Sequence, residues 1–215
     1  MRFFSYESRF SQILLKICYS CYLNLLWFVF SIPIFTIGAA TTALYYVSLK
    51  VVRGEEGNVG RTFVRAFREN FKQSTVVWLI LFGIGLFLAG DGYILYHLRA
   101  SSEGGPAVFW TILLAIVIAA SVVYVIELLY IFPLMASVVN TNRAMFKNAF
   151  LIGTHYLFAT ILAFAVHFAM FFVVVAWFTP LIVFGEGLCA MITAWLLNNI
   201  LIISSGTSED AEGNE

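Results

Sequence analysis

This sequence has few charged residues. Asp, Glu, Lys and Arg make up 11% of its 215 residues, whereas soluble proteins average about a quarter. Hydrophobic residues make up 61%, so the composition excludes an ordinary soluble domain and indicates an integral membrane protein. The 12 basic residues balance the 12 acidic ones. Net charge therefore gives no reason to expect nucleic-acid binding, and the positions of the charges carry the information.

Cysteine is also scarce, with three residues, which excludes a disulfide framework. Cys18 and Cys21 have C-x-x-C spacing, but no second Cys or His pair lies nearby, and we interpret them as small apolar helix residues. The sequence also lacks H-E-x-x-H, G-x-S-x-G and a phosphate-binding Gly-Lys-Ser/Thr loop. We therefore expect no enzymatic activity, no catalytic residues, no cofactor and no metal site.

Long apolar runs, in contrast, fill most of the chain. A helix needs roughly 20 apolar residues to cross a hydrocarbon core about 30 Å thick. Four runs meet this length, at 75–97, 107–138, 154–178 and 181–203, the last two separated by a turn at Thr179–Pro180. The first run, 17–52, is ambiguous, because as one helix it would measure about 54 Å.

The distribution of basic residues decides how often this first run crosses. A single crossing would place the basic residues before it and those after it on opposite sides of the membrane, against the positive-inside rule. Two crossings place eleven of the twelve on the cytoplasmic side and leave only Arg99 outside. These eleven are Arg2, Arg9, Lys16, Lys50, Arg53, Arg61, Arg65, Arg68, Lys72, Arg143 and Lys147. We therefore predict an all-α membrane bundle of about six transmembrane helices, with both termini cytoplasmic.

The stretch "SIPIFTIGAATTA" is where the first run turns. Pro33 is expected to end the first helix, and the small residues 38–43 to open the second. Small side chains allow close backbone approach, so we expect this second helix to be buried among the others. A re-entrant element that enters and leaves on one face satisfies the same charge argument and stays open as an alternative.

Residues 58–73, "NVGRTFVRAFRENFKQ", read as a basic amphipathic cytoplasmic helix between spans two and three. Phe63, Phe67 and Phe71 recur every four residues, and Asn58 is a candidate N-cap. The other faces carry the candidate lipid-binding or partner-binding residues Arg61, Arg65, Arg68 and Lys72. Membrane lipids are the first expected ligand of this face, and a partner protein is the alternative.

A shorter segment, "RAMFKNAF" at 143–150, resembles this element, so spans two and three and spans four and five are candidates for related units. We expect one transmembrane helical domain over 1–205. The last residues, 206–215, are acidic and polar and are predicted to be a disordered tail.

The chain also resembles a known family over residues 10–100. The elements that carry the likeness follow in order: Leu-Trp, Pro-x-x-T-I-G, A-L-Y-Y and F-R-E-N-F-K-Q. They are similar to the YesL-like family of bacterial integral membrane proteins, whose biochemical role is unestablished. The resemblance implies a bacterial plasma membrane and, through gene neighbourhood, a link to carbohydrate uptake and sugar ABC transporters. It supplies no catalytic residues.

Ionisable residues inside the apolar runs are the remaining candidates, because such residues are costly in a membrane. Asp91 lies in the outer part of span three, Glu127 deeper in span four and His167 near the centre of span five. Glu127 follows Ser121 and Tyr124 and precedes Tyr130 in three-residue steps, which we interpret as one polar face. Asn198 and Asn199 are expected to be interhelical hydrogen-bonding residues.

Two functions follow. The first is a non-catalytic accessory or regulatory membrane protein that binds a partner, such as a sugar ABC transporter permease. The second is a small transporter or channel with a polar route through Asp91, Glu127 and His167. An intramembrane enzyme built from the same three residues is a weaker alternative. A water-accessible path that touches Glu127 would favour transport, and a closed bundle with an exposed basic face would favour the accessory role.

The topology predicts which loops an impermeant reagent can reach. Single cysteines at Asn58 and Ser102, in a variant without Cys18, Cys21 and Cys189, should respond oppositely to an impermeant maleimide in intact cells. Ser102 should be labelled and Asn58 protected, because the basic segments stay inside. The reverse pattern would overturn the six-span arrangement.

Overall fold

The computed structural model describes residues 9–55, 57–176 and 185–198, and every regular element in them is a helix. In chain order these are α1 (Arg9–Ser31), a short 3₁₀ turn η1 (Ile34–Thr36), α2 (Ile37–Arg53), α3 (Val59–Ala100), α4 (Gly105–Ser137), α5 (Asn142–His155), α6 (Leu157–Ala176) and a last helix at 185–198. The all-α prediction is confirmed for this part of the chain.

Five of the described helical segments are long and apolar enough to cross a membrane: Ser11–Ser31, Ile34–Arg53, Val59–Ala100, Gly105–Ser137 and Leu157–Ala176. The sixth predicted span, 181–203, is described only at 185–198, where it is helical. Its ends, the turn at Thr179–Pro180, Asn199 and the predicted tail 206–215 lie outside the described residues.

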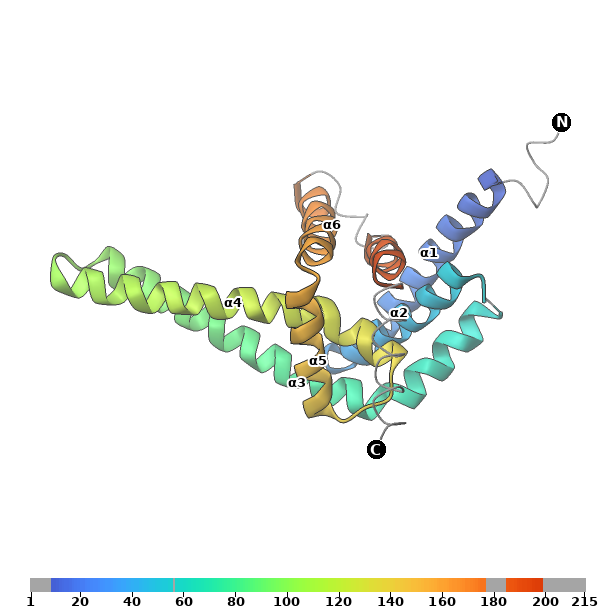
Figure 1. Cartoon of the computed structure of the whole chain (residues 1–215), viewed down its shortest axis with the longest axis horizontal. Coiled ribbons are helices and arrows are strands. Elements are labelled where there is room, and N and C mark those ends of the chain that lie inside the picture. The colour runs from blue at the N-terminus through green and yellow to red at the C-terminus, as the bar shows by residue number, and fades with distance from the viewer. Residues whose placement is uncertain (1–8, 56, 177–184, 199–215) are drawn as a thin grey trace.

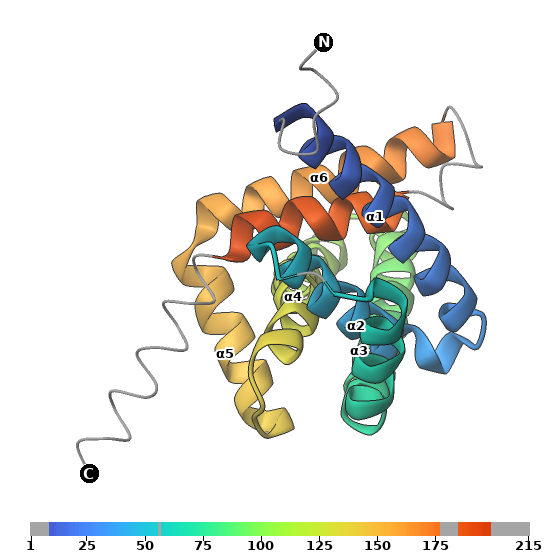
Figure 2. The same cartoon turned by 90° about the vertical axis from the view of Figure 1, so that its right-hand side faces the viewer.

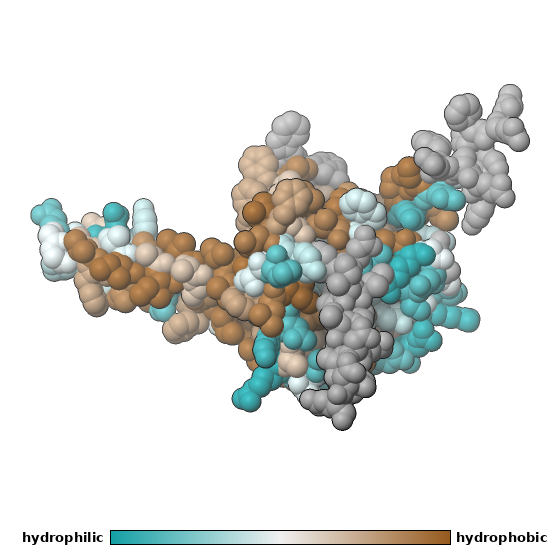
Figure 3. Space-filling model, viewed as in Figure 1, coloured by the Kyte–Doolittle hydropathy of each residue, from teal (hydrophilic) through white to brown (hydrophobic). Residues whose placement is uncertain are grey.

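The longest helices, α3 and α4, form an antiparallel hairpin that projects from the rest of the molecule (Figure 1). The other helices gather at the opposite end, where α6 and the helix at 185–198 run across the direction of the hairpin (Figure 2). The visible surface of the hairpin is largely hydrophobic, whereas hydrophilic residues gather at its tip and at the far end of the molecule (Figure 3). This pattern suits a hairpin that crosses an apolar layer.

The chain turns back between α1 and α2, as predicted. α1 ends at Ser31, Pro33 precedes the 3₁₀ turn, and α2 begins at Ile37. The Thr36 hydroxyl donates to the carbonyl oxygens of Phe30 and Pro33, 2.6 Å from each. The Trp27 indole N–H then donates to the Thr41 hydroxyl across the two helices, at 3.0 Å. The break therefore comes from Pro33 and is fixed by hydrogen bonds between neighbouring turns.

The start of α2 is buried, which confirms the prediction drawn from its small residues. All six residues from Gly38 to Ala43 are buried. A Cβ on Gly38 would lie 2.5 Å from both the Ser74 carbonyl oxygen and the Trp78 Cβ, so α3 approaches the backbone of α2 directly. One turn on, the buried hydroxyls of Thr42 and Ser74 form a hydrogen bond of 2.9 Å. Small residues thus set the contact between α2 and α3.

The amphipathic segment 58–73 differs from its prediction in two respects, its end and the packing of its apolar face. It is helical, but it continues without a break into span three as the 42-residue helix α3. Phe63 is fully buried, and the Phe67 ring lies 4.8 Å from the ring of Phe30 on α1. The apolar face therefore packs on protein and is not free to lie on a lipid surface. No Gly or Pro separates Lys72 from Trp78, so nothing in the sequence ends the helix there. Figure 1 shows that α3 changes direction along its length instead.

The helix at 185–198 is attached to the first two helices at both of its ends. The backbone N–H of Gly187 donates to the Asn24 side-chain oxygen on α1, at 2.6 Å. The Arg53 guanidinium donates to the Asn198 side-chain oxygen, at 2.7 Å. Asn198 is therefore an interhelical hydrogen-bonding residue, as predicted.

The close approach of α2 and α3 predicts an asymmetric response to added methyl groups. Gly38→Ala should lower the melting temperature in detergent, because overpacking against backbone costs about 1–3 kcal/mol. Gly83→Ala is the matched control on α3, since nothing lies within 4 Å of its Cβ position. Both changes carry the same helix-propensity gain. Equal melting temperatures for the two variants would contradict the close approach.

A basic groove and an intramembrane polar cluster as candidate sites

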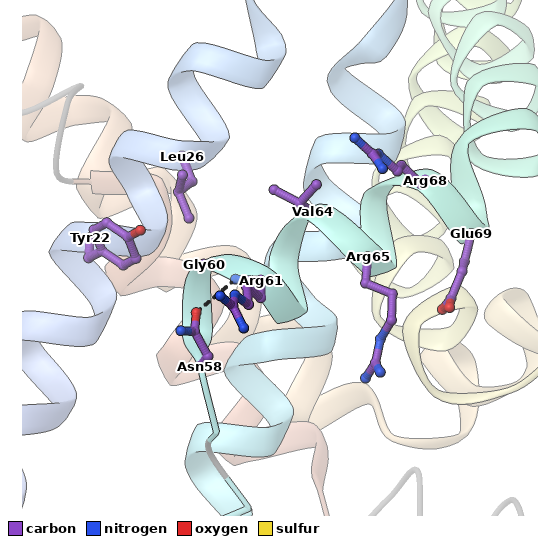
Figure 4. Close-up of a pocket in the computed structure, with 9 residues that line it drawn as sticks. All are labelled: Tyr22, Leu26, Asn58, Gly60, Arg61, Val64, Arg65, Arg68 and Glu69. Atoms are coloured by element: carbon purple, nitrogen blue, oxygen red, sulfur yellow. Dashed lines mark hydrogen bonds between the residues drawn. The ribbon is translucent and has the colours of Figure 1, made fainter.

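A groove of about 710 Å³ lies between α1 and the first turns of α3 (Figure 4). Tyr22 and Leu26 reach into it from α1, and Val64 faces them from α3. Its other lining residues come from the start of α3 and the residue before it: Asn58, Gly60, Arg61, Arg65, Arg68 and Glu69. One wall is therefore apolar and the other is rich in arginine.

Local sequence explains how the floor of the groove forms. Asn58 caps α3, because its side-chain oxygen accepts the Arg61 backbone N–H at 3.0 Å. This confirms the predicted cap. Gly60 faces α1, and a Cβ there would lie 2.7 Å from the Tyr22 hydroxyl. Absence of a side chain at this position lets α1 approach the beginning of α3.

Burial of the phenylalanines on one face turns the arginines outward. With Phe63 in the core, Arg61, Arg65 and Arg68 are all exposed and line the groove. Lys72 is exposed on the same helix but lies beyond the groove lining. Within the described residues, none of the three guanidinium groups forms an ion pair or a side-chain hydrogen bond. Their donors are therefore available to a ligand.

The groove is suited to binding anionic groups. Guanidinium groups bind carboxylates and phosphates through paired N–H donors. The lining offers Glu69 as its one carboxyl and holds no His, Cys or Lys. Among the described residues of the whole chain, no group of three or more His, Cys, Asp or Glu side chains is placed to hold a metal ion.

The predicted intramembrane residues lie at separate places. Two contacts fix the register of the α3–α4 hairpin: the Trp78 ring lies 6.4 Å from the Phe132 ring, and the position of a Gly85 Cβ lies against the Tyr124 hydroxyl. In this register Asp91 lies level with residue 118 and Glu127 with residue 82. About nine residues, or roughly 13 Å along α3, therefore separate Asp91 from Glu127.

His167 lies elsewhere, on α6 and near Glu186 of the helix at 185–198. Its Nδ1 is 2.9 Å from the Ala163 carbonyl oxygen one turn before it. The Glu186 carboxyl lies near enough to interact electrostatically with His167 and with Tyr45 of α2. Glu186 is absent from the sequence predictions, although a carboxyl inside the apolar run 181–203 is the signal that should have identified it.

The polar face predicted around Glu127 is divided between two sides of α4. Ser121 lines an apolar groove toward α6, and the Tyr130 hydroxyl forms a 2.8 Å hydrogen bond with Thr160 of α6. Tyr124 lies against α3 instead. Steps of three residues drift by about 60° each around a helix, so four such residues cannot share a face. The Glu127 Oε2 is buried and has no hydrogen-bond partner among the described residues.

Three comparisons place these sites in context. Residues 21–91 match a family model described as "Protein of unknown function, DUF624". The chain is 28% identical over 169 residues to "Uncharacterized protein YteU" of Bacillus subtilis (strain 168), covering 76% of this chain and 71% of YteU. It is 26% identical over 136 residues to "Uncharacterized protein YesL" of the same organism, covering 61% of this chain and 60% of YesL. No solved structure matches the chain. These matches confirm the resemblance to the YesL-like family.

The groove lies within the segment that matches the family model. Every residue that lines the groove, from Tyr22 to Glu69, falls within the matched residues 21–91. Asp91 is the last matched residue, and Glu127, His167 and Glu186 fall outside the match. The groove is therefore the candidate site that lies wholly inside the family segment.

The unpartnered Glu127 carboxyl predicts an unusual response to substitution. Glu127→Leu should leave the melting temperature in detergent unchanged or raise it, because it removes a buried polar group without breaking a hydrogen bond. Tyr130→Phe should lower it, since the loss of the bond to Thr160 costs on the order of 1 kcal/mol. A marked loss of stability in Glu127→Leu would show that the carboxyl has a partner.

Proposed function

Because the chain belongs to the DUF624 family, as a distant relative of YesL and YteU, we propose that it is a non-catalytic accessory component of the membrane. In this proposal the basic groove binds an acidic cytoplasmic segment of a partner membrane protein. The single observation that supports it most is the groove itself, a recess with three unpaired arginines inside the family segment.

Geometry favours a protein partner over a general attraction to lipid. An amphipathic helix that binds a membrane inserts its apolar face among the lipids. Here that face is already occupied, because Phe63 is buried and Phe67 packs against Phe30. The arginines instead stand beside an apolar wall formed by Tyr22 and Leu26 of α1, which Val64 faces from α3. A peptide with acidic and apolar residues complements both walls, whereas a lipid headgroup uses only one.

A link to carbohydrate uptake is part of this proposal and rests on the family resemblance alone. A sugar ABC transporter permease is the partner that the resemblance implies, in a bacterial plasma membrane with both termini cytoplasmic. The distribution of basic residues supports that orientation, since the groove carries three of the eleven residues expected inside.

Transport by the protein itself has less support. A polar route needs its ionisable residues along one path, but Asp91 and Glu127 are separated along the hairpin and His167 interacts with Glu186. Glu127 lines neither the basic groove nor the apolar groove between α4 and α6.

The test is photo-crosslinking in the native host. A photoreactive amino acid at Val64, in the groove, should give a discrete crosslinked product with one membrane protein, and the same group at Ile116, on the exposed hairpin, should not. Replacement of Arg61, Arg65 and Arg68 by Gln should abolish the product. Replacement of Arg143 and Lys147 by Gln is the matched control and should preserve it.

The outcomes separate the parts of the proposal. A crosslinked sugar permease supports both docking and the carbohydrate link. A partner of another class supports docking and overturns the carbohydrate link. Crosslinking to lipid alone, or a product that survives loss of the three arginines, overturns docking.

A further inference from the structure

The helix at 185–198 ends beside the connection that leads into the basic groove. Its last described residue, Asn198, accepts a 2.7 Å hydrogen bond from the Arg53 guanidinium at the end of α2. Asn58, which caps α3 and lines the groove, follows Arg53 by five residues. Consecutive Cα atoms are about 3.8 Å apart, so Asn58 lies within about 19 Å of Arg53. The chain therefore continues beyond Asn198 from a point close to the start of α3.

The residues that follow, 199–215, lie outside the described structure and carry charge of one sign. They include no Lys, Arg or His and four acidic side chains: Glu209, Asp210, Glu212 and Glu215. Glu209 comes eleven residues after Asn198. An extended chain of that length spans up to about 36 Å. This exceeds the separation of about 19 Å that the connection allows between Arg53 and Asn58, so the acidic residues can reach the groove.

The groove offers these carboxylates suitable donors. Arg61, Arg65 and Arg68 are exposed, and among the described residues none of their guanidinium groups has a partner. They follow one another at intervals of about one turn along the beginning of α3 (Figure 4). Glu69 is the one carboxyl in the lining, so the groove keeps an excess of positive charge. A guanidinium binds a carboxylate through paired N–H donors.

The other exposed basic pair outside α3 suits the acidic residues less well. Arg143 and Lys147 lie on α5 and together supply one guanidinium and one ammonium group. An ammonium group binds as a point charge and lacks the forked donors of arginine. Arg53 already donates to Asn198. Number and type of donors therefore favour the groove.

We infer that residues 209–215, the acidic segment, occupy the basic groove of the same chain, with their carboxylates paired to Arg61, Arg65 and Arg68. A short link between two binding elements gives an effective concentration in the millimolar range. A partner's acidic segment must displace the acidic segment of this chain, which lowers the apparent affinity of the groove for the partner. This regulatory step rests on the proposed function, whereas occupation of the groove does not.

A disulfide between the groove and the acidic segment tests occupation in the purified full chain. In the variant without native cysteines, Val64→Cys with Ala211→Cys should form an intramolecular disulfide under mild oxidation. Glu55→Cys with Ala211→Cys is the control pair, because Glu55 is exposed and lies nearer to Arg53 along the chain than the groove does. The groove pair should oxidise several times faster, and high salt should remove the difference by screening the charges.

Replacement of arginines identifies the binding surface. Arg61, Arg65 and Arg68 changed to Gln should slow oxidation of the groove pair to the rate of the control pair. Arg143 and Lys147 changed to Gln should leave it unchanged. Equal rates for the two cysteine pairs, or a groove pair that oxidises as fast without the three arginines, would overturn the inference. Leu26→Cys, from the other wall of the groove, replaces Val64→Cys where that variant does not accumulate.

Removal of the acidic segment tests the regulatory step in the native host. A chain shortened to end at Ser208, with the photoreactive amino acid at Val64, should give more of the crosslinked partner than the full chain. An unchanged amount of product would overturn regulation by the acidic segment. If neither chain gives a product, the proposed function fails, and the disulfide test still decides whether the acidic segment occupies the groove.

Discussion

The close packing of α2 on α3 is the contact on which the rest of this structure depends. Gly38 brings the two backbones together, and the buried Thr42–Ser74 hydrogen bond fixes their register. A buried hydrogen bond of this kind is costly to lose, because each hydroxyl would then be buried without a partner. Small residues are therefore required along this face of α2, and larger ones would separate the helices.

The groove and the turn after α1 both follow from that packing. Towards its start, α3 is placed beside α1, so that Phe63 and Phe67 meet Phe30 and the arginines are left facing the groove. Near the level of Gly38, Trp78 reaches the Ile34 carbonyl oxygen and holds the turn between α1 and α2. A shift of one helical turn between α2 and α3 would remove both arrangements together.

Local features of this fold could be predicted from the sequence. The turn after Pro33, the buried small residues 38–43 and the Asn58 cap each depend on a few neighbouring residues, and each is confirmed. Pairings between distant segments could not be predicted in the same way. Phe63 and Phe67 form an apolar face that suits lipid or protein equally, and only the position of Phe30 decides between them. The boundary predicted after Gln73 was wrong, because amphipathicity can change along one continuous helix.

The same distinction between local features and pairings of distant segments holds for the candidate sites. Exposure of Arg61, Arg65 and Arg68 could be predicted from the helical period, but the groove needs Tyr22 and Leu26 from another helix. Glu186, on the helix at 185–198, interacts with His167 on α6, and the sequence pattern around neither residue indicates the other. The predicted stripe through Glu127 failed because its three-residue spacing drifts around α4.

The most direct test of the α2–α3 packing is a disulfide across it. Thr42→Cys with Ser74→Cys, in the variant without native cysteines, should form an intramolecular disulfide on mild oxidation, detected by a change in mass after alkylation. The control pair, Thr42→Cys with Val76→Cys, should stay reduced, because Val76 is exposed on another face of α3. Absence of the 42–74 disulfide in folded protein, or equal oxidation of both pairs, would contradict the packing that positions the groove and the turn.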